Sequence, residues 1–228
     1  MAFAPSSPGR LTDRDLGRFP ADTLFDRLGR AVCHAGVLPR KELYEAWEVA
    51  RRTRRLFRGG RVLDLGAGHG LLAHVMLLLD DSSPIALAID KRIPASSARL
   101  HKALTTAWPR LSGRVSFIAG QLDRVDIERS DVVVSSHACG ALTDVVLDRA
   151  AAARARVAVL PCCHHLARQD AAGLRGWVDG ALAVDIRRAQ RLEARGYRVW
   201  TQLIAAAVTP RNRLLLGACT AEDPSRSS

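Results

Sequence analysis

The stretch Val62-Leu-Asp-Leu-Gly-Ala-Gly-His-Gly-Leu71 decides the fold of this 228-residue chain. A short apolar run leads directly into three glycines at alternate positions, Gly66, Gly68 and Gly70. Because glycine has no Cβ, such a loop can turn sharply, and its backbone can lie against a ligand while the next helix begins. The stretch therefore predicts a strand, a loop that binds a nucleotide-like ligand, and a helix.

The next segments extend this pattern into a βαβ unit. Leu71 to Leu79 is an apolar run that predicts a largely buried helix, and the sequence Asp-Asp-Ser-Ser-Pro84 is expected to end it. A second strand over 85–89 ends in Asp90, 24 positions after Gly66. An acidic residue at this place in a nucleotide-binding unit accepts hydrogen bonds from ribose hydroxyls. Loop and acid together indicate a nucleoside-containing cofactor, whereas the alternative is a glycine-rich turn that binds nothing.

The glycine spacing separates two cofactor classes. The dinucleotide pattern is G-x-G-x-x-G, whereas this chain has G-x-G-x-G, and Leu71 stands where the third glycine of that pattern would fall. Asp64, two positions before Gly66, would repel a diphosphate and attract a cationic amino group. The stretch resembles motif I of the class I S-adenosylmethionine-dependent methyltransferases. The resemblance implies S-adenosylmethionine as the cofactor, bound by Asp64, Gly66, Ala67, Gly68, Gly70, Asp90 and Lys91.

The rest of the chain predicts alternating strands and helices. We expect further strands over 114–119, 131–136, 156–160, 197–208 and 213–219, and helices over 96–107, 141–153 and 174–195. The Thr-Pro-Arg-Asn212 turn predicts that the last two strands form an antiparallel hairpin. Segments 21–38 and 40–57 have helical apolar spacing and should cap the sheet. The predicted fold class is α/β, a Rossmann-like seven-stranded class I methyltransferase sheet with a C-terminal antiparallel hairpin and N-terminal capping helices.

Composition indicates one domain with loose ends. A hydrophobic content of 48% over 228 residues is enough to bury a core. Residues 1–20 are rich in Ser, Pro, Gly and Arg, and we expect them to be flexible. We expect N-terminal helices over 21–58, the methyltransferase domain over 59–220 and a flexible tail over 221–228.

Charge and cysteine content bear on location and partners. The five cysteines do not suggest a disulfide framework, and the sequence has neither a long apolar run nor a secretory signal. We therefore expect a cytoplasmic protein that does not enter a membrane. The net charge of +11 is compatible with RNA binding or with a solvated basic surface. The basic run from Arg51 to Arg61 is either the exposed face of a helix or part of an RNA-binding rim.

Two later strands are each followed by residues with reactive side chains. His137-Ala-Cys-Gly-Ala-Leu-Thr-Asp144 follows the strand over 131–136, and Pro161-Cys-Cys-His-His165 follows the strand over 156–160. In an open parallel sheet, ligands bind beyond the carboxyl ends of the strands, so both segments should face the cofactor. Gln121 and Leu122, after the third strand, stand where class I methyltransferases contact adenine, and Ser136 and His137 are further candidate contacts.

These motifs resemble a narrower methyltransferase group. Its members carry H-x-C-G-x-x-T-D after strand four, C-C-H or C-C-Y after strand five, and T-P-K-N, similar to Thr-Pro-Arg-Asn212 here. The group includes eukaryotic tRNA 2'-O-ribose methyltransferases and bacterial single-domain members, and the resemblance covers about residues 40–219. It implies methyl transfer, with RNA as one acceptor. The sequence lacks the zinc-finger-like segments of the tRNA enzymes, which leaves a small molecule or protein as the acceptor, or a non-catalytic cofactor-binding domain, as alternatives.

His137 is the leading candidate for the base that removes a proton from a hydroxyl acceptor, because histidine titrates near neutrality. His164 is the second candidate, and in the alternative interpretation each histidine only shapes the pocket. Neighbouring cysteines and neighbouring histidines do not easily aim two ligands at one ion, so we predict no metal site. Cys162 and Cys163 are expected to be packing residues. We expect Asp144 to interact with the helix dipole, and Asp185 to lie on a solvated helix face.

Overall fold

The computed structural model describes residues 3–164, 166 and 171–220. Thirteen regular elements form the fold: α1 (Leu24–Ala35), α2 (Arg40–Leu56), β1 (Val62–Leu65), α3 (Leu71–Leu79), β2 (Ala86–Asp90), α4 (Ser97–Ala107), β3 (Val115–Ala119), β4 (Val132–Ser135), α5 (Ala141–Ala152), β5 (Arg156–Val159), α6 (Gly180–Glu193), β6 (Tyr197–Leu203) and β7 (Arg213–Cys219), all within the described residues. Short 3₁₀ helices are η1 (Asp13–Arg18), η2 (Pro109–Leu111), η3 (Leu122–Arg124) and η4 (Ala172–Gly176).

The strands form a single seven-stranded sheet in the order β3-β2-β1-β4-β5-β7-β6. Strands β1 to β5 pair in parallel, and β7 runs antiparallel to both β5 and β6. The chain reverses its direction of progress across the sheet between β1 and β4, and a crevice for a ligand opens at such a switch point. The predicted α/β fold with its C-terminal hairpin is confirmed.

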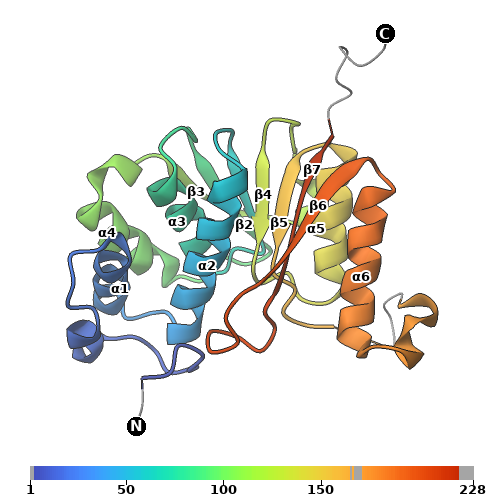
Figure 1. Ribbon diagram of the computed structural model, residues 1–228. Coiled ribbons are helices and arrows are strands. Elements are labelled where there is room, and N and C mark those ends of the chain that lie inside the picture. Colours follow the sequence, from blue (N-terminus) through green and yellow to red (C-terminus); the bar gives the residue numbers. More distant parts are fainter. Residues whose placement is uncertain (1–2, 165, 167–170, 221–228) are drawn as a thin grey trace.

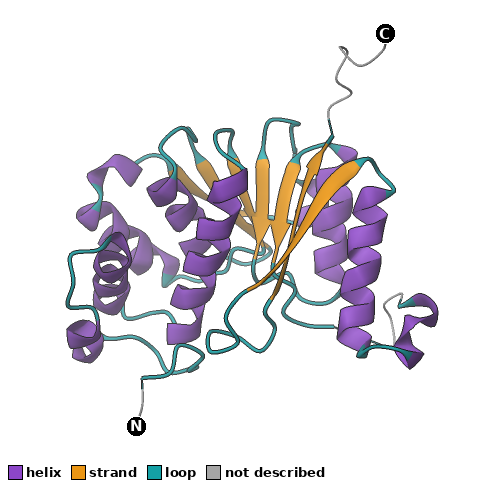
Figure 2. Ribbon diagram, in the orientation of Figure 1, coloured by secondary structure: helices purple, strands orange, loops and turns teal. Residues whose placement is uncertain are grey.

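Helices cover both faces of the sheet (Figures 1 and 2). In Figure 1, α1 to α4 lie to the left of the sheet and α5 and α6 to its right. Successive side chains of a strand point to opposite faces, so a strand between two helical layers is apolar on both sides. In β4, Val132 and Val134 pack into the core beneath α2 and α3, whereas Val133 packs into the core beneath α5. This double burial explains why the strand sequences are nearly continuous apolar runs.

The two N-terminal helices cap the sheet as expected. The side chain of Thr23 accepts a hydrogen bond from the backbone of Asp26 at the start of α1, and Gly36, with φ of +61°, ends that helix. Helix α2 buries Leu43, Val49 and Arg54 against the rest of the molecule. These helices share one hydrophobic core with α3, α4 and the sheet, so they belong to the same folded body as the sheet.

We expected residues 1–20 to be flexible, but in the structure the segment 3–20 is anchored to the rest of the molecule. Leu11 and Phe19 are buried, and the backbone N–H of Leu11 donates to the carbonyl of Leu38 at 2.9 Å. Gly29 of α1 leaves room for the Phe19 ring, because a Cβ there would lie 2.3 Å from it. The isolated apolar residues of this polar segment thus anchor it to α1 and α2. The tail predicted over 221–228 lies outside the described residues.

Two element boundaries also differ from prediction. Helix α6 begins at Gly180 rather than at 174, because the Asp179 side chain accepts hydrogen bonds from the backbone of Ala181 and Leu182 and so caps the helix there. Strand β6 ends at Leu203 rather than at 208, and the side-chain amide of Asn212 donates to the carbonyl of Ile204. The hairpin turn is therefore longer than the Thr-Pro-Arg-Asn212 sequence by itself suggests.

Candidate active site

The loop between β1 and α3 contains three glycines in the left-handed backbone conformation, and their surroundings differ. Gly66, Gly68 and Gly70 have φ of +75°, +52° and +76°. A Cβ on Gly66 would lie 3.3 Å from the backbone nitrogen of Ala138, and one on Gly70 would lie 2.7 Å from the Phe117 ring. A Cβ on Gly68 would meet nothing within 4 Å. Gly66 and Gly70 thus allow close packing, whereas Gly68 borders open space that a ligand can use.

Asp90, at the end of β2, holds this loop. Its Oδ2 accepts a hydrogen bond from the backbone N–H of Gly68 at 2.9 Å, and its Oδ1 accepts one from that of Arg92 at 3.3 Å. A carboxylate oxygen can accept more than one hydrogen bond, so Asp90 retains acceptor capacity for a ligand hydroxyl. The acid therefore shapes the loop and remains available to a ligand.

A cleft of about 400 Å³ opens beside the loop, at the carboxyl ends of the parallel strands. Asp123, Leu142 and Val145 line part of it. The other lining residues are six that we predicted as cofactor contacts: Gly66, Asp90, Lys91, Gln121, Leu122 and His137. These residues come from the segments that follow β1, β2, β3 and β4. The tertiary fold thus brings together residues spread over 80 positions of sequence.

The other five predicted contacts do not line this cleft. Ala67 is buried within the loop, Gly68 and Gly70 belong to its backbone, and Ser136 is buried at the end of β4. The prediction did not include Leu142, which lines the cleft from the first turn of α5 and is 48% exposed. Leu142 is the apolar residue inside the His137–Asp144 motif, at the predicted start of a helix, and that placement is the signal that could have identified it.

Asp64 lies beneath the loop and is only 1% exposed. Its Oδ2 accepts a hydrogen bond from the backbone N–H of Ala73 at 3.1 Å, while its Oδ1 is buried and has no hydrogen-bond partner among the described residues. Burial raises the pKa of this carboxyl; the Ala73 N–H lowers it in part, the charge of Asp90 adds a smaller rise, and the resulting pKa is about 7. An unsatisfied buried acceptor is costly, and a cationic group or hydrogen-bond donor would relieve it.

The loop after β4 is fixed by its own hydroxyl groups. Ser135 Oγ accepts a hydrogen bond from the backbone N–H of Ala138 at 3.2 Å, and Thr143 Oγ1 donates to the carbonyl of Ala138. His137 is half-buried between these anchors and lines the cleft. The threonine of the H-x-C-G-x-x-T-D motif therefore shapes the loop that presents His137.

His164 has different surroundings from His137. Its side chain is 3% exposed, and its Nε2 donates to Asp185 Oδ1 at 2.7 Å, whereas its Nδ1 is buried without a partner among the described residues. His164 is not among the residues that line the cleft. The neighbouring His165 lies outside the described residues.

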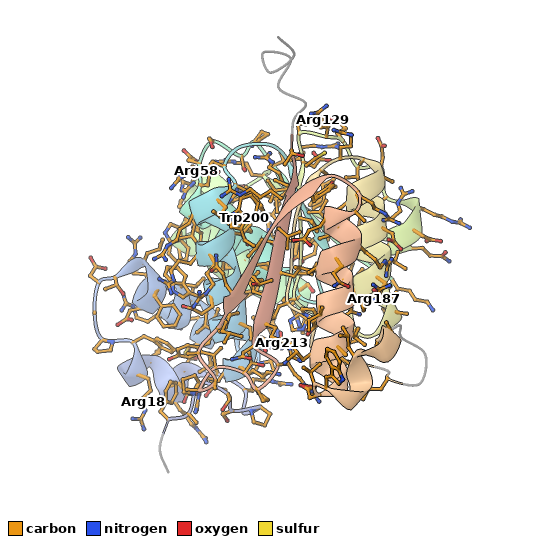
Figure 3. The ribbon with its side chains drawn as sticks, turned by 45° about the vertical axis from the view of Figure 1, so that its right-hand side comes forward. Arg18, Arg58, Arg129, Arg187, Trp200 and Arg213 are labelled. Carbon is orange, nitrogen blue, oxygen red and sulfur yellow. The ribbon has the colours of Figure 1, made fainter. Side chains whose placement is uncertain are left out.

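The expectation of a solvated Asp185 is wrong. Asp185 Oδ2 accepts from Arg213 Nε at 2.8 Å, and its Oδ1 also accepts from Arg188 Nη1 at 3.1 Å. Figure 3 shows Arg213 at the lower end of β7. Burial by itself would raise the pKa of Asp185, but the hydrogen bonds from His164 and Arg213 outweigh it and hold that pKa below its ordinary value. The helical periodicity of the sequence assigned Asp185 to the polar face of α6. Its burial comes from β7 and the loop after β5, which pack against that face.

Arg188 connects the same region to the loop after β4. It is 1% exposed and donates to both carboxylate oxygens of Asp144, at 3.1 and 3.0 Å, and to the carbonyl of Gly140 at 3.0 Å. Asp144 is therefore an ion-pair partner in addition to its position in the first turn of α5. We call Asp144, Arg188, Asp185, His164 and Arg213 the α6 network; it joins α5 and α6 to β7 and to the loops after β4 and β5.

Three thiols meet between the loops after β4 and β5. The Sγ atoms of Cys139 and Cys162 are 2.9 Å apart, and those of Cys139, Cys162 and Cys163 all lie within 4.8 Å of one another. Burial raises the pKa of the Cys139 and Cys162 thiols, and their proximity to each other and to Cys163 adds to the rise for Cys162. We expected neighbouring cysteines not to aim two ligands at one ion easily, but the Sγ atoms of Cys162 and Cys163 lie close together, in an irregular loop after Pro161 that does not alternate like a strand.

The basic run from Arg51 to Arg61 is largely paired within the molecule. Arg54 is 2% exposed and lies 3.1 Å from Asp80, and Arg61 makes two hydrogen bonds of 2.9 Å to Asp131. Burial lowers the pKa of Arg54 to about 10. Arg58 is exposed, but it lies at the upper end of the molecule in Figure 3, opposite to Arg213. These internal ion pairs fit neither a wholly exposed helix face nor an RNA-binding rim.

A second cationic surface was not anticipated. A hollow of about 730 Å³ between α1 and α4 is lined by ten residues, of which five are basic: Arg27, Arg30, His34, Arg99 and Lys102. No acidic residue lines it. We call this hollow the α1–α4 groove. Basic residues three and four positions apart on each helix are a weak sequence signal for it, because only the packing of α1 on α4 unites the two faces.

The sequence and the fold resemble those of known methyltransferases. A family model described as "Methyltransferase domain" matches residues 42–170. An O-methyltransferase family protein from Burkholderia thailandensis has a TM-score of 0.54 and 19% identity, over 95% of this chain and 66% of that protein. Mitomycin 7-O-methyltransferase MmcR has a TM-score of 0.51 and 18% identity, over 92% and 64%. A SAM-dependent O-methyltransferase from Thermotoga maritima has a TM-score of 0.50 and 15% identity, over 77% and 64%.

The chain spans slightly less than two thirds of the length of these three solved structures, and at such identities the likeness concerns the fold. No curated protein matches the sequence. Among the described residues, every helix is too short or too polar to cross a membrane.

Proposed function

This chain belongs to the methyltransferase-domain family, whose model matches more than half of it, and on this premise we propose that it catalyses S-adenosylmethionine-dependent methyl transfer at the cleft beside Gly66. The observation that carries the proposal is the convergence of the glycine loop, Asp90 and His137 on one cleft at the switch point of the sheet. Ligands of open α/β sheets bind at this place.

The residues present fit S-adenosylmethionine. Asp64 offers a buried oxygen without a partner to the positively charged end of the cofactor, and Gly68 leaves the loop surface free. Asp90 has acceptor capacity for the ribose hydroxyls, and Gln121 and Leu122 border the part of the cleft proposed for the adenine. A cleft of about 400 Å³ lies in the range of pockets that hold such ligands. When bound, S-adenosylmethionine supplies a methyl group on an electrophilic sulfonium.

The chain's own contribution to catalysis is positioning and proton removal. Most of the acceleration of a methyl transfer can come from holding the acceptor atom in line with the methyl group. His137 is the residue of the cleft suited to take the proton of a hydroxyl acceptor. The α6 network and Thr143 fix the loops on either side of His137, so they act as positioning residues.

RNA is the acceptor that we propose first. The α1–α4 groove presents Arg27, Arg99 and Lys102 together with Arg30 and His34, which pair with Asp22 and Asp13, and the chain carries a net charge of +11. Such a surface attracts a phosphate backbone irrespective of base sequence. The groove borders α4, whose N-terminus follows the Asp90 loop, so an RNA held there would extend toward the cleft.

A small molecule is the second candidate acceptor. A cavity of about 440 Å³ lies between α6 and the β6–β7 hairpin, and most of its lining is apolar, including Leu182, Ile186 and Leu214. Pro161, at the end of β5, and Asp185 also border it. A concave, largely apolar surface with polar groups at its border is typical of a small-molecule site.

Binding and transfer assays test these proposals. Calorimetry should detect saturable binding of S-adenosylmethionine, and binding of NAD with none of S-adenosylmethionine would refute the cofactor assignment. The protein should then be incubated with labelled S-adenosylmethionine and, separately, with total RNA, a small-molecule extract and a protein extract. Label in RNA supports the first acceptor, and label only in another fraction excludes it. Binding without label in any fraction would indicate a non-catalytic domain.

A further inference from the structure

The convergence of Cys139, Cys162 and Cys163 is the feature that the proposed function does not use. Strands β4 and β5 are parallel neighbours, so their carboxyl ends deliver Cys139 and the Cys162–Cys163 pair to the same place. The backbone N–H of Gly140 donates to the carbonyl of Cys163 at 3.1 Å. This hydrogen bond joins the two loops directly beside the thiols and limits how far they can separate.

The distances suit a metal ion. Zinc binds thiolate sulfur at about 2.3 Å in tetrahedral geometry, which places two sulfur ligands roughly 3.8 Å apart. Here the Sγ atoms of Cys139 and Cys162 are 2.9 Å apart, and no two of the three Sγ atoms are more than 4.8 Å apart. The required separation lies between these two values, so the three Sγ atoms are close enough together to bind one ion.

The surroundings support the loops that carry these ligands. Arg188 donates to the carbonyl of Gly140, the residue after Cys139, and the buried ion pair of His164 with Asp185 fixes the residue after Cys163. These contacts hold the backbone beside two of the three cysteines in place. Cys139 and Cys163 are exposed, which gives an ion access from solvent. Lys41, in the first turn of α2, places a positive charge near Cys139 and would offset part of the negative charge of three thiolates.

We propose that Cys139, Cys162 and Cys163 bind one zinc ion through three thiolates, with the fourth coordination position open to water or an incoming ligand. Each thiol releases its proton to solvent as the ion binds, and no electrons are transferred. Structural zinc sites have four protein ligands, whereas three ligands and an open position are characteristic of reactive sites. Ala138, next to Cys139, packs against Gly66, so the ion would lie at the edge of the proposed cofactor cleft.

Metal titration of the full chain tests the proposal. Reduced protein, stripped of metal with a chelator, should bind one cobalt ion per chain and develop the absorption bands of tetrahedral cobalt with thiolate ligands, and zinc should displace the cobalt. Cys139→Ser, Cys162→Ser and Cys163→Ser should each weaken zinc binding by more than about 100-fold, because even indirect changes around a site cost about 10- to 100-fold. Cys219→Ser is the matched control, since Cys219 is partly buried at the end of β7, and it should leave binding unchanged.

A second measurement needs no substitution, so it remains valid if the cysteine variants do not fold. In the unaltered protein, zinc should protect Cys139, Cys162 and Cys163 from alkylation while Cys219 still reacts. The proposal is overturned if cobalt gives no thiolate absorption, if binding survives in Cys139→Ser/Cys162→Ser, or if mass spectrometry finds a Cys139–Cys162 disulfide and no bound metal. None of these assays uses S-adenosylmethionine, so their failure leaves the proposed function standing, and the failure of that function leaves the metal site standing.

Discussion

Asp90 Oδ2 accepts a hydrogen bond of 2.9 Å from the backbone N–H of Gly68. The acid at the end of β2 and the middle glycine of the loop after β1 therefore form one unit, although they are 22 residues apart. Asp90 has two roles in the proposed site, since it sets the loop conformation and accepts hydrogen bonds from the cofactor.

Replacing Asp90 should affect cofactor binding strongly. We expect Asp90→Ala to weaken S-adenosylmethionine binding by more than about tenfold, because ribose hydrogen bonds and the Gly68 contact are both lost. Calorimetry measures the change, and Asp22→Ala is the control, since Asp22 is highly exposed and far along the chain from the loop. Unchanged affinity in Asp90→Ala would remove Asp90 from the binding site.

The loop glycines allow a matched comparison. Gly68 and Gly113 both have positive φ, and a Cβ on either would meet nothing within 4 Å. Gly68→Ala and Gly113→Ala should therefore destabilise the protein similarly, by about 1 kcal/mol. Only Gly68→Ala should weaken S-adenosylmethionine binding, because its methyl group enters the space proposed for the ligand. Equal affinities for the two variants would place the ligand elsewhere.

Asp64 should make stability depend on pH. Burial raises its folded-state pKa to about 7, whereas an unfolded aspartate titrates near 4, so its contribution is complete below about pH 4 and is lost as the pH rises through about 7. Between pH 5 and pH 8 the free energy of unfolding should fall, relative to Asp64→Asn, by at least about 1.4 kcal/mol, equivalent to a tenfold change in proton affinity.

Urea unfolding of both proteins at the two pH values measures this difference. Saturating S-adenosylmethionine should reduce it, because a bound cation favours the charged carboxylate. A difference that stays constant with pH would mean that Asp64 is already ionised at pH 5 in the folded protein.

Arg188 should contribute to stability. Its guanidinium is 1% exposed and pairs with Asp144 and Asp185, so Arg188→Met removes a buried donor from two carboxylates that keep Arg191 and Arg213 as partners. The free energy of unfolding should fall by about 2–3 kcal/mol. Arg195→Met is the comparison, because its ion pair with Asp148 joins two half-exposed side chains, and a loss of no more than about 1 kcal/mol is expected. Urea denaturation that ranks the two variants equally would contradict the role of the α6 network.

The two histidine candidates should respond differently to substitution. His137→Gln should lower the rate of methyl transfer by about 100-fold or more, with a much smaller effect on thermal stability, because His137 lines the cleft. His164→Gln should lower the thermal unfolding temperature, because His164 is a buried partner of Asp185. Single-turnover rates and thermal unfolding of both variants separate these roles, and a full rate in His137→Gln would remove it as the base.

Most of the fold could be predicted from the sequence because its signals are local. The apolar runs of β1, β4 and β5 and the glycines at positive φ act over a few residues each. Those three strands lie within about one residue of their predicted positions, whereas α6 begins later and β6 ends earlier than predicted. The cleft was partly predictable for the same reason. Residues that end parallel strands meet at one edge of the sheet, so Asp90 and His137 could be assigned to one site without coordinates.

What only the tertiary structure decided depends on side chains from distant segments. Cys139 and Cys162 are 23 positions apart in sequence, and the pairing of β4 with β5 brings them together. The helical spacing of α6 placed Asp185 on a polar face, but the packing of α6 against β7 brings it to Arg213. Leu11 and Phe19 likewise became buried only when α1 and α2 supplied a surface for them. Local sequence sets backbone conformation and periodicity, whereas burial and side-chain contact are properties of the assembled chain.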